Sequence, residues 1–184
     1  MDPFDRFLRR PLDEILISQG VLTRERANEL LESCVQSGAT FGTMLVESNT
    51  LTPWDLAKAV ATHYQMPVQP LTGYHFDKEL LLGLSPEMLR RHMAVPLGVF
   101  GATRTFAVLE PPGRPLLDEL QAVCGSSIFF FVAEGPEISK ALEDHVKVVD
   151  ATKDTNWHRL FDTAEEEISK GLPSKAEGAP RPKS

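Results

Sequence analysis

The chain has 184 residues, enough to bury the core of one domain or of two very small ones, and its composition is typical of globular proteins. Its net charge of −7 excludes the electrostatic footprint of a nucleic-acid-binding protein, because 26 acidic side chains outnumber 19 Lys and Arg residues. No stretch approaches the ~18 apolar residues of a membrane span, and the N-terminus lacks the apolar core of a signal peptide. We therefore expect a cytoplasmic protein with no direct membrane insertion.

The N-terminal third of the chain contains two copies of one sequence repeat. LDEILISQGVLTRERANELL is followed, at an offset of 29 residues, by FGTMLVESNTLTPWDLAKAV. In the first copy, Gly20 suits the left-handed position that ends a helix, and Thr23 is suited to cap the next helix. Asn49 and Thr52 hold the same places in the second copy. Each copy is therefore predicted to be a helical hairpin, and the two are expected to pack on each other because neither can cover its apolar side alone.

The second helix of each copy carries an apolar stripe with helical spacing. We expect these stripes to supply much of the buried side of the hairpins: Ala27, Leu30, Leu31, Cys34 and Val35 in the first copy, and Trp54, Ala57, Val60, Ala61 and Tyr64 in the second.

The pattern changes at residue 66. MPVQPL is broken by proline, DKELLLGL favours a short helix, and Ser85 is suited to cap a helix with Pro86 in its first turn. AVPLGVF and TFAVLEP are typical of a hairpin, SIFFFVAE of a strand buried on both faces, and RPLLDELQAVCG and GPEISKALEDHVKVV of helices. The predicted class is α+β: duplicated helical hairpins over 1–65, then a small α+β unit with about three strands over 66–150.

Residues 151–184 are predicted to form an amphipathic helix followed by a disordered tail rich in Pro, Gly, Lys and Ser. Five apolar side chains share one face of that helix and are a candidate surface for docking a partner: Trp157, Leu160, Phe161, Ala164 and Ile168. The same helix could instead fold back onto its own domain, and the sequence leaves both readings open.

The order of these elements resembles the N-terminal domain of type II secretion and type IV pilus assembly ATPases, some of which are MshEN domains that bind cyclic-di-GMP. The strings HYQMPVQPL, LSPEMLRRHMAVPLGV, LDELQAVCG and EISKALEDH carry the resemblance, which covers roughly residues 10–146. It implies a bacterial interaction or adaptor module that docks onto secretion, pilus or signalling proteins, recruited to the inner-membrane face. The sequence contains no GxxxxGK[ST] phosphate loop, so we expect a free-standing module that is not an ATPase.

The family's ligand-binding motif is similar to RLGxxLxxxGxxxxxxLxxxxxxxQ and occurs in two copies. Its arginine can stack on a guanine and bind a phosphate. Here Asp13 replaces the first glycine of copy one, while copy two has Thr40 in the arginine position and keeps Gly42. The resemblance therefore implies a degenerate groove, and a cyclic-di-GMP sensor is the alternative to the adaptor. The candidate lining is Arg10, Leu12, Leu16, Gly20, Phe41, Gly42, Leu45 and His63.

Other chemistry is not predicted. The five histidines show no metal-ligand spacing, and a nucleophilic pair of Cys34 with His63 would lack both an oxyanion hole and an orienting third group. Cys34 and Cys124 are expected to be packing residues, and Arg90 and Arg91 to complement a helix dipole. We expect no enzyme activity, no metal and no cofactor.

Overall fold

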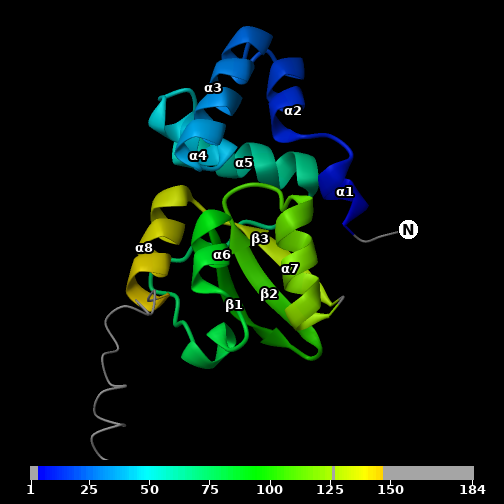
Figure 1. The fold of residues 1–184 in the computed structure, drawn as a ribbon, viewed down its shortest axis with the longest axis vertical. Coiled ribbons are helices and arrows are strands. Elements are labelled where there is room, and N and C mark those ends of the chain that lie inside the picture. Colours follow the sequence, from blue (N-terminus) through cyan, green and yellow to red (C-terminus); the bar gives the residue numbers. More distant parts are fainter. Residues whose placement is uncertain (1–3, 126, 147–184) are drawn as a thin grey trace, which may run out of the picture. The chain divides into compact units, whose positions relative to one another are not determined.

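The two copies of the repeated phrase fold into helical hairpins with matching ends. The computed structural model describes residues 4–125 and 127–146 (Figure 1). Gly20 and Asn49, each two positions after the last residue of the first helix of its copy, take φ angles of 72° and 55°. The Thr23 and Thr52 hydroxyls accept the capping hydrogen bonds of the second helices. The helices are α1 (Asp5–Leu8), α2 (Leu12–Ser18), α3 (Arg24–Ser37), α4 (Phe41–Glu47) and α5 (Pro53–Tyr64).

A three-stranded sheet forms the second part of the fold, as predicted. Strand β1 (Ala94–Phe100) runs antiparallel to β2 (Thr103–Val108), and β2 runs parallel to β3 (Ile128–Val132), which gives the order β1-β2-β3. Parallel neighbours need a crossover, and α7 (Arg114–Cys124) supplies it between β2 and β3.

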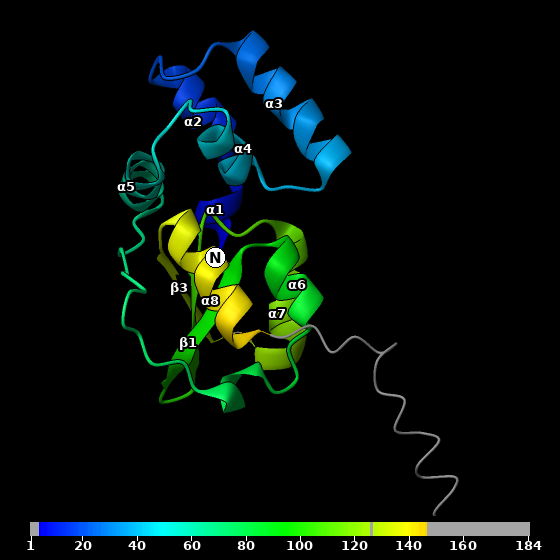
Figure 2. The ribbon, with the colours of Figure 1, turned by 90° about the vertical axis from the view of Figure 1, so that its left-hand side faces the viewer.

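The remaining helices cover the sheet. The 3₁₀ helix η1 (Lys78–Leu81) and α6 (Pro86–Arg91) precede β1, and α8 (Gly135–His145) follows β3. Helices α6 and α8 both contact β1, beside which they lie in Figure 2. The Arg90 guanidinium donates hydrogen bonds to the carbonyls of Leu142 and Val146. Arg90 therefore serves the C-terminal carbonyls of α8, a neighbouring helix, whereas Arg91 pairs with Glu87 on α6 itself.

One hydrophobic core runs through both parts of the fold. Phe130 of β3 meets Phe4 and Phe7 edge-on, at ring-centroid distances of 6.2 and 5.8 Å, and Tyr64 of α5 lies against Phe7. Tyr64 and Met66 are both buried in this core, so hydrophobic contact is continuous where the sequence suggested a boundary between 1–65 and 66–150. That subdivision stays a prediction.

Four side chains predicted to be buried are exposed, and one of them is Leu31 of α3, at 38%. Val35, near the end of α3, is 86% exposed, and Trp54, in the first turn of α5, is 53% exposed, because helix ends reach past the surface that the hairpins share. Phe129 is also exposed, because β3 buries Ile128, Phe130 and Val132 in strict alternation and has only one fully covered face. The predicted helix with Trp157, Leu160, Phe161, Ala164 and Ile168 lies outside the described residues.

Candidate functional site

The structure divides the predicted ligand groove between two cavities. Leu12 and Phe41 line a cavity of about 280 Å³ that we call the Glu110 pocket. Leu16 and His63 line a different cavity, of about 360 Å³, bounded by α2 and α5. Of the other predicted lining residues, Leu45 is fully buried, and Arg10 and Gly20 belong to neither cavity. The eight residues proposed from the repeated phrase therefore do not form one continuous site.

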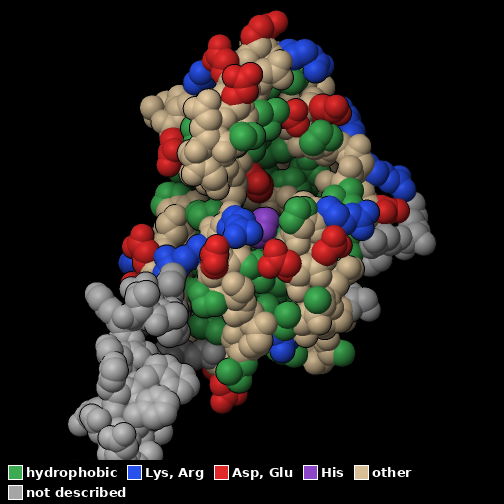
Figure 3. All heavy atoms as spheres, in the orientation of Figure 1, with side chains coloured by type: hydrophobic (Ala, Val, Ile, Leu, Met, Phe, Trp, Pro, Cys, Tyr) green, Lys and Arg blue, Asp and Glu red, His purple; other side chains and the backbone are tan. Residues whose placement is uncertain are grey.

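The Glu110 pocket is walled by apolar side chains from four helices and by the loop that follows β2. Figure 3 shows a hollow of this kind between α2 and α3, surrounded by hydrophobic side chains and with an acidic side chain inside it. Its charged lining residues are Asp13 and Glu110, and no Lys, Arg or His lines it among the described residues. Among the described residues, the lining consists of Phe7, Leu8, Pro11, Leu12, Asp13, Leu31, Phe41, Glu110, Pro111, Pro112 and Gly113.

The Glu110 carboxylate is held against the second repeat. Its Oε2 accepts a hydrogen bond of 2.6 Å from the Gly42 backbone N–H, and the Thr40 hydroxyl donates to the same carboxylate. A Cβ atom on Gly42 would lie 3.0 Å from Glu110 Oε2 and 3.2 Å from Leu109 Cγ, so a larger residue would require these side chains to shift. Burial raises the pKa of Glu110 despite these two hydrogen bonds. Gly42, the glycine that the second copy of the repeat retains, thus donates its N–H to a carboxylate of the same chain.

Glu110 also contributes to the pKa shifts of two neighbouring groups. Burial, and secondarily the negative charge of Glu110, raise the pKa of the Cys34 thiol. Burial, Asp13 and Glu110 raise the pKa of Tyr64, with a weaker opposing effect from Arg10, whose carbonyl accepts the Tyr64 hydroxyl at 2.7 Å. The surroundings of this pocket are therefore net acidic.

Two polar side chains that line the cavity bounded by α2 and α5 are hydrogen-bonded to each other. The Gln19 side-chain amide is hydrogen-bonded to the His63 ring, which links the two helices. His63 is therefore paired with a glutamine rather than with Cys34, the partner considered for it in a nucleophilic pair. Within the described part of the chain, no three His, Cys, Asp or Glu side chains gather in a way that could hold a metal ion.

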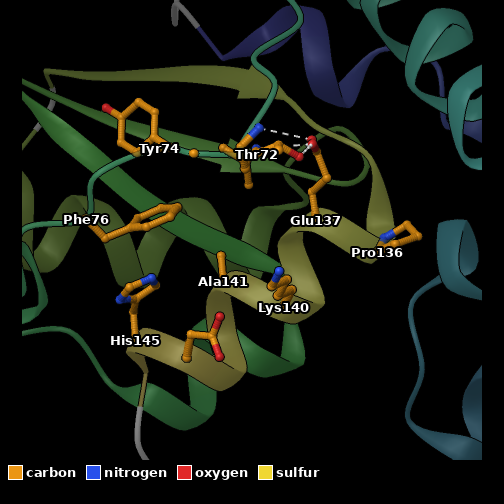
Figure 4. Close-up of a pocket in the computed structure, with 11 residues that line it drawn as sticks. Thr72, Tyr74, Phe76, Pro136, Glu137, Lys140, Ala141 and His145 are labelled. Atoms are coloured by element: carbon orange, nitrogen blue, oxygen red, sulfur yellow. Dashed lines mark hydrogen bonds between the residues drawn. The ribbon is translucent and has the colours of Figure 1, made fainter.

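Sequence reasoning missed a third cavity, of about 420 Å³, between the loop at residues 71–76 and helix α8 (Figure 4). On one side the Phe76 ring lies 4.6 Å from the His145 ring. On the other, the Glu137 carboxylate accepts hydrogen bonds from the Leu71 and Thr72 N–H groups and from the Thr72 hydroxyl. Burial opposes ionisation of Glu137, but these three bonds lower its pKa overall. The polar groups of this cavity hold the loop to α8.

Residues 64–151 match the MshEN domain family. The match covers 88 of the 184 residues, and we use the name MshEN domain for that matched segment. A type IV pilus assembly ATPase, PilB of Myxococcus xanthus (strain DK1622), is 22% identical over 132 residues, which are 72% of this chain and 23% of PilB. The chain thus spans about a quarter of that relative, and the match extends beyond the MshEN domain itself.

Two solved structures have the same fold as the present chain. A structure of MshE with cdg (cyclic-di-GMP) superposes with a TM-score of 0.55 at 20% identity, over 74% of this chain and 99% of that one. The N-terminal domain of XpsE gives a TM-score of 0.56 at 17% identity, over 78% and 95%. The resemblance to N-terminal domains of secretion and pilus ATPases, predicted from the sequence, is confirmed, and so is the α+β class.

Proposed function

We propose that this chain is a non-catalytic interaction module, an adaptor that binds a protein of a secretion, pilus or signalling system. The observation that carries the proposal is the hydrogen bond between Gly42 and Glu110. A backbone group that the resemblance assigned to ligand approach is occupied by a carboxylate of the chain itself. The proposed site of action is the cytoplasmic face of the inner membrane, to which a partner would recruit the module. No described helix is long and apolar enough to cross a membrane.

The electrostatics of the Glu110 pocket favour the adaptor over a cyclic-di-GMP sensor. Cyclic-di-GMP carries two phosphate charges, and the pocket offers Asp13 and Glu110 with no cation in its lining. Two like charges about 4 Å apart repel by about 4 kcal/mol at an effective dielectric constant of about 20. MshE is the neighbour whose structure contains cyclic-di-GMP. For the present chain, that ligand remains the alternative candidate.

A calorimetric titration separates the two functions. We expect no heat of binding with cyclic-di-GMP at about 100 μM, which would half-saturate a site with a binding free energy of about −5.5 kcal/mol. Binding that is lost in Arg10→Ala but kept in the adjacent control Arg9→Ala would replace the adaptor with the sensor.

Cross-linking in the native cells tests the adaptor directly. A photoreactive residue in place of Leu31, on the wall of the Glu110 pocket, is expected to capture a secretion, pilus or signalling component. The same residue in place of Glu25, on the solvent side of α3, serves as the control. Capture of the same proteins from both positions, or of no such component from Leu31, would count against the adaptor.

A further inference from the structure

The apolar wall of the Glu110 pocket continues onto the outside of the protein. Leu31 lines the pocket and is 38% exposed, and Val35, one helical turn further along the same side of α3, is 86% exposed. Phe41 adds a half-buried aromatic ring to the wall. This surface is wider than one side chain can cover, so its occupant is a chain segment with several apolar groups.

The pocket holds the carboxyl groups of Glu110 and Asp13, and no Lys, Arg or His lines it among the described residues. The two ion pairs within the described residues, Arg26–Glu29 and Arg91–Glu87, both lie elsewhere. Glu110 accepts hydrogen bonds from Gly42 and Thr40. An ionised carboxylate has about four acceptor positions, so capacity remains for a further donor. Asp13 adds a second carboxylate in the first turn of α2.

These features together select the chemistry of the occupant. A purely apolar segment would remove water from the Glu110 carboxylate without giving it a counter-charge, which is costly. An acidic segment would add repulsion. A Lys or Arg side chain satisfies both parts of the pocket, because its aliphatic stem packs on apolar walls while its charged end meets the carboxylates.

We propose, as a refinement that rests on the adaptor function, that the Glu110 pocket binds a protein segment presenting a lysine or arginine next to an apolar residue. The cation pairs with Glu110 and Asp13, and the apolar neighbour lies on Leu31 and Val35. The partner of the module is therefore recognised by a basic, apolar stretch of its chain.

The test uses a displayed library of random linear peptides, selected for binding to the full chain. We expect the enriched peptides to share a Lys or Arg beside an apolar residue. Their affinity should fall about tenfold or more in Glu110→Gln, which removes the charge but keeps an oxygen that can accept the Gly42 N–H. Glu143→Gln makes the same change of net charge on the exposed side of α8 and should leave binding unchanged.

Each other outcome overturns the inference. Enriched peptides without a basic residue, or peptides that bind Glu110→Gln as tightly as wild type, would place binding elsewhere and leave the adaptor function standing. A library that yields no binder would count against both. If Glu110→Gln fails to fold by circular dichroism, Asp13→Asn tests the same charge from the rim of the pocket. It should weaken the same peptides severalfold, and unchanged affinity would refute the proposal.

Discussion

Gly42 and Glu110 are 68 residues apart in the sequence and are joined by a hydrogen bond of 2.6 Å from the Gly42 N–H to the Glu110 carboxylate. The bond connects the start of α4, in the second repeat, to the loop after β2, in the MshEN domain. A hydrogen bond from a backbone N–H to a side-chain oxygen contributes about 0.5–1.5 kcal/mol to stability, and more where the acceptor is ionised. It therefore ties the hairpins to the MshEN domain at the pocket that we propose as the docking site.

Replacing Gly42 with alanine should destabilise the protein. The new Cβ would lie 3.0 Å from Glu110 Oε2 and force the carboxylate away from its hydrogen bond. We expect a net loss of about 1–3 kcal/mol in urea unfolding, because the clash and the lost bond outweigh the gain of up to ~1 kcal/mol in helix propensity.

A double-mutant cycle isolates the cause of that loss. In a Glu110→Ala background the carboxylate is absent, so Gly42→Ala should cost much less there than in wild type. Equal costs in the two backgrounds would show that the alanine clashes with Leu109 alone.

The raised pKa of Glu110 predicts that ionisation of this side chain lowers the stability of the folded protein as pH rises. Burial makes the folded state hold this proton more tightly than the unfolded state, where the pKa is near 4.5. Between that pH and the folded pKa the native protein binds more protons, so its stability falls with increasing pH. Glu110→Gln cannot titrate and should therefore gain stability relative to wild type as pH rises through this window.

Thermal unfolding of the two proteins at a series of pH values from about 4 to 8 measures this difference. Asp13, Cys34 and Tyr64 also face this region, from α2, α3 and α5, but they are present in both proteins. A difference in melting temperature that does not change with pH would mean that Glu110 has an ordinary pKa.

Local signals explain why the fold was predictable. The caps at Thr23, Thr52 and Ser85 each act over three residues, and the left-handed positions of Gly20 and Asn49 over one turn. Each is therefore visible in a short window of sequence. The sequence predicted three strands but not their directions, and the structure shows that β2 and β3 pair in parallel across the α7 crossover.

The candidate site was not predictable in the same way. Leu12 and Leu16 are one turn apart on α2, yet they line different cavities, because Leu12 faces α3, α4 and the loop after β2, whereas Leu16 faces α5. Glu110 is far away in sequence and carries no motif of its own. Its only signal was an acidic residue directly after a buried strand, followed by two prolines.

The exposure of Trp54 leads to a prediction opposite to that of its sequence pattern. Helical spacing placed Trp54 on the buried stripe of α5, whereas the structure leaves it 53% exposed and buries Leu56 completely. Trp54→Phe should change the free energy of unfolding by less than about 0.5 kcal/mol. Leu56→Ala should cost about 2–5 kcal/mol. Comparable losses of unfolding free energy for the two variants in urea would show that Trp54 belongs to the core.

The three hydrogen bonds to Glu137 should decide how firmly the loop at residues 71–76 is held to α8. Glu137→Ala removes the acceptor of the Leu71 and Thr72 N–H groups, so hydrogen exchange of these two amides should accelerate. The side chain is partly exposed, so we expect a global loss of only about 1 kcal/mol. Glu143→Ala, on the exposed side of the same helix, should leave both amides unchanged.

The pKa of Glu137 is lowered, so its stabilising contribution is present above the unfolded value of 4.5 and is lost as pH falls through the folded value. Exchange at Leu71 and Thr72 should therefore accelerate in acid in the wild type, beyond the intrinsic pH effect, and not in Glu137→Ala. Equal protection factors in the two proteins would show that hydrophobic contacts, and not Glu137, hold the loop.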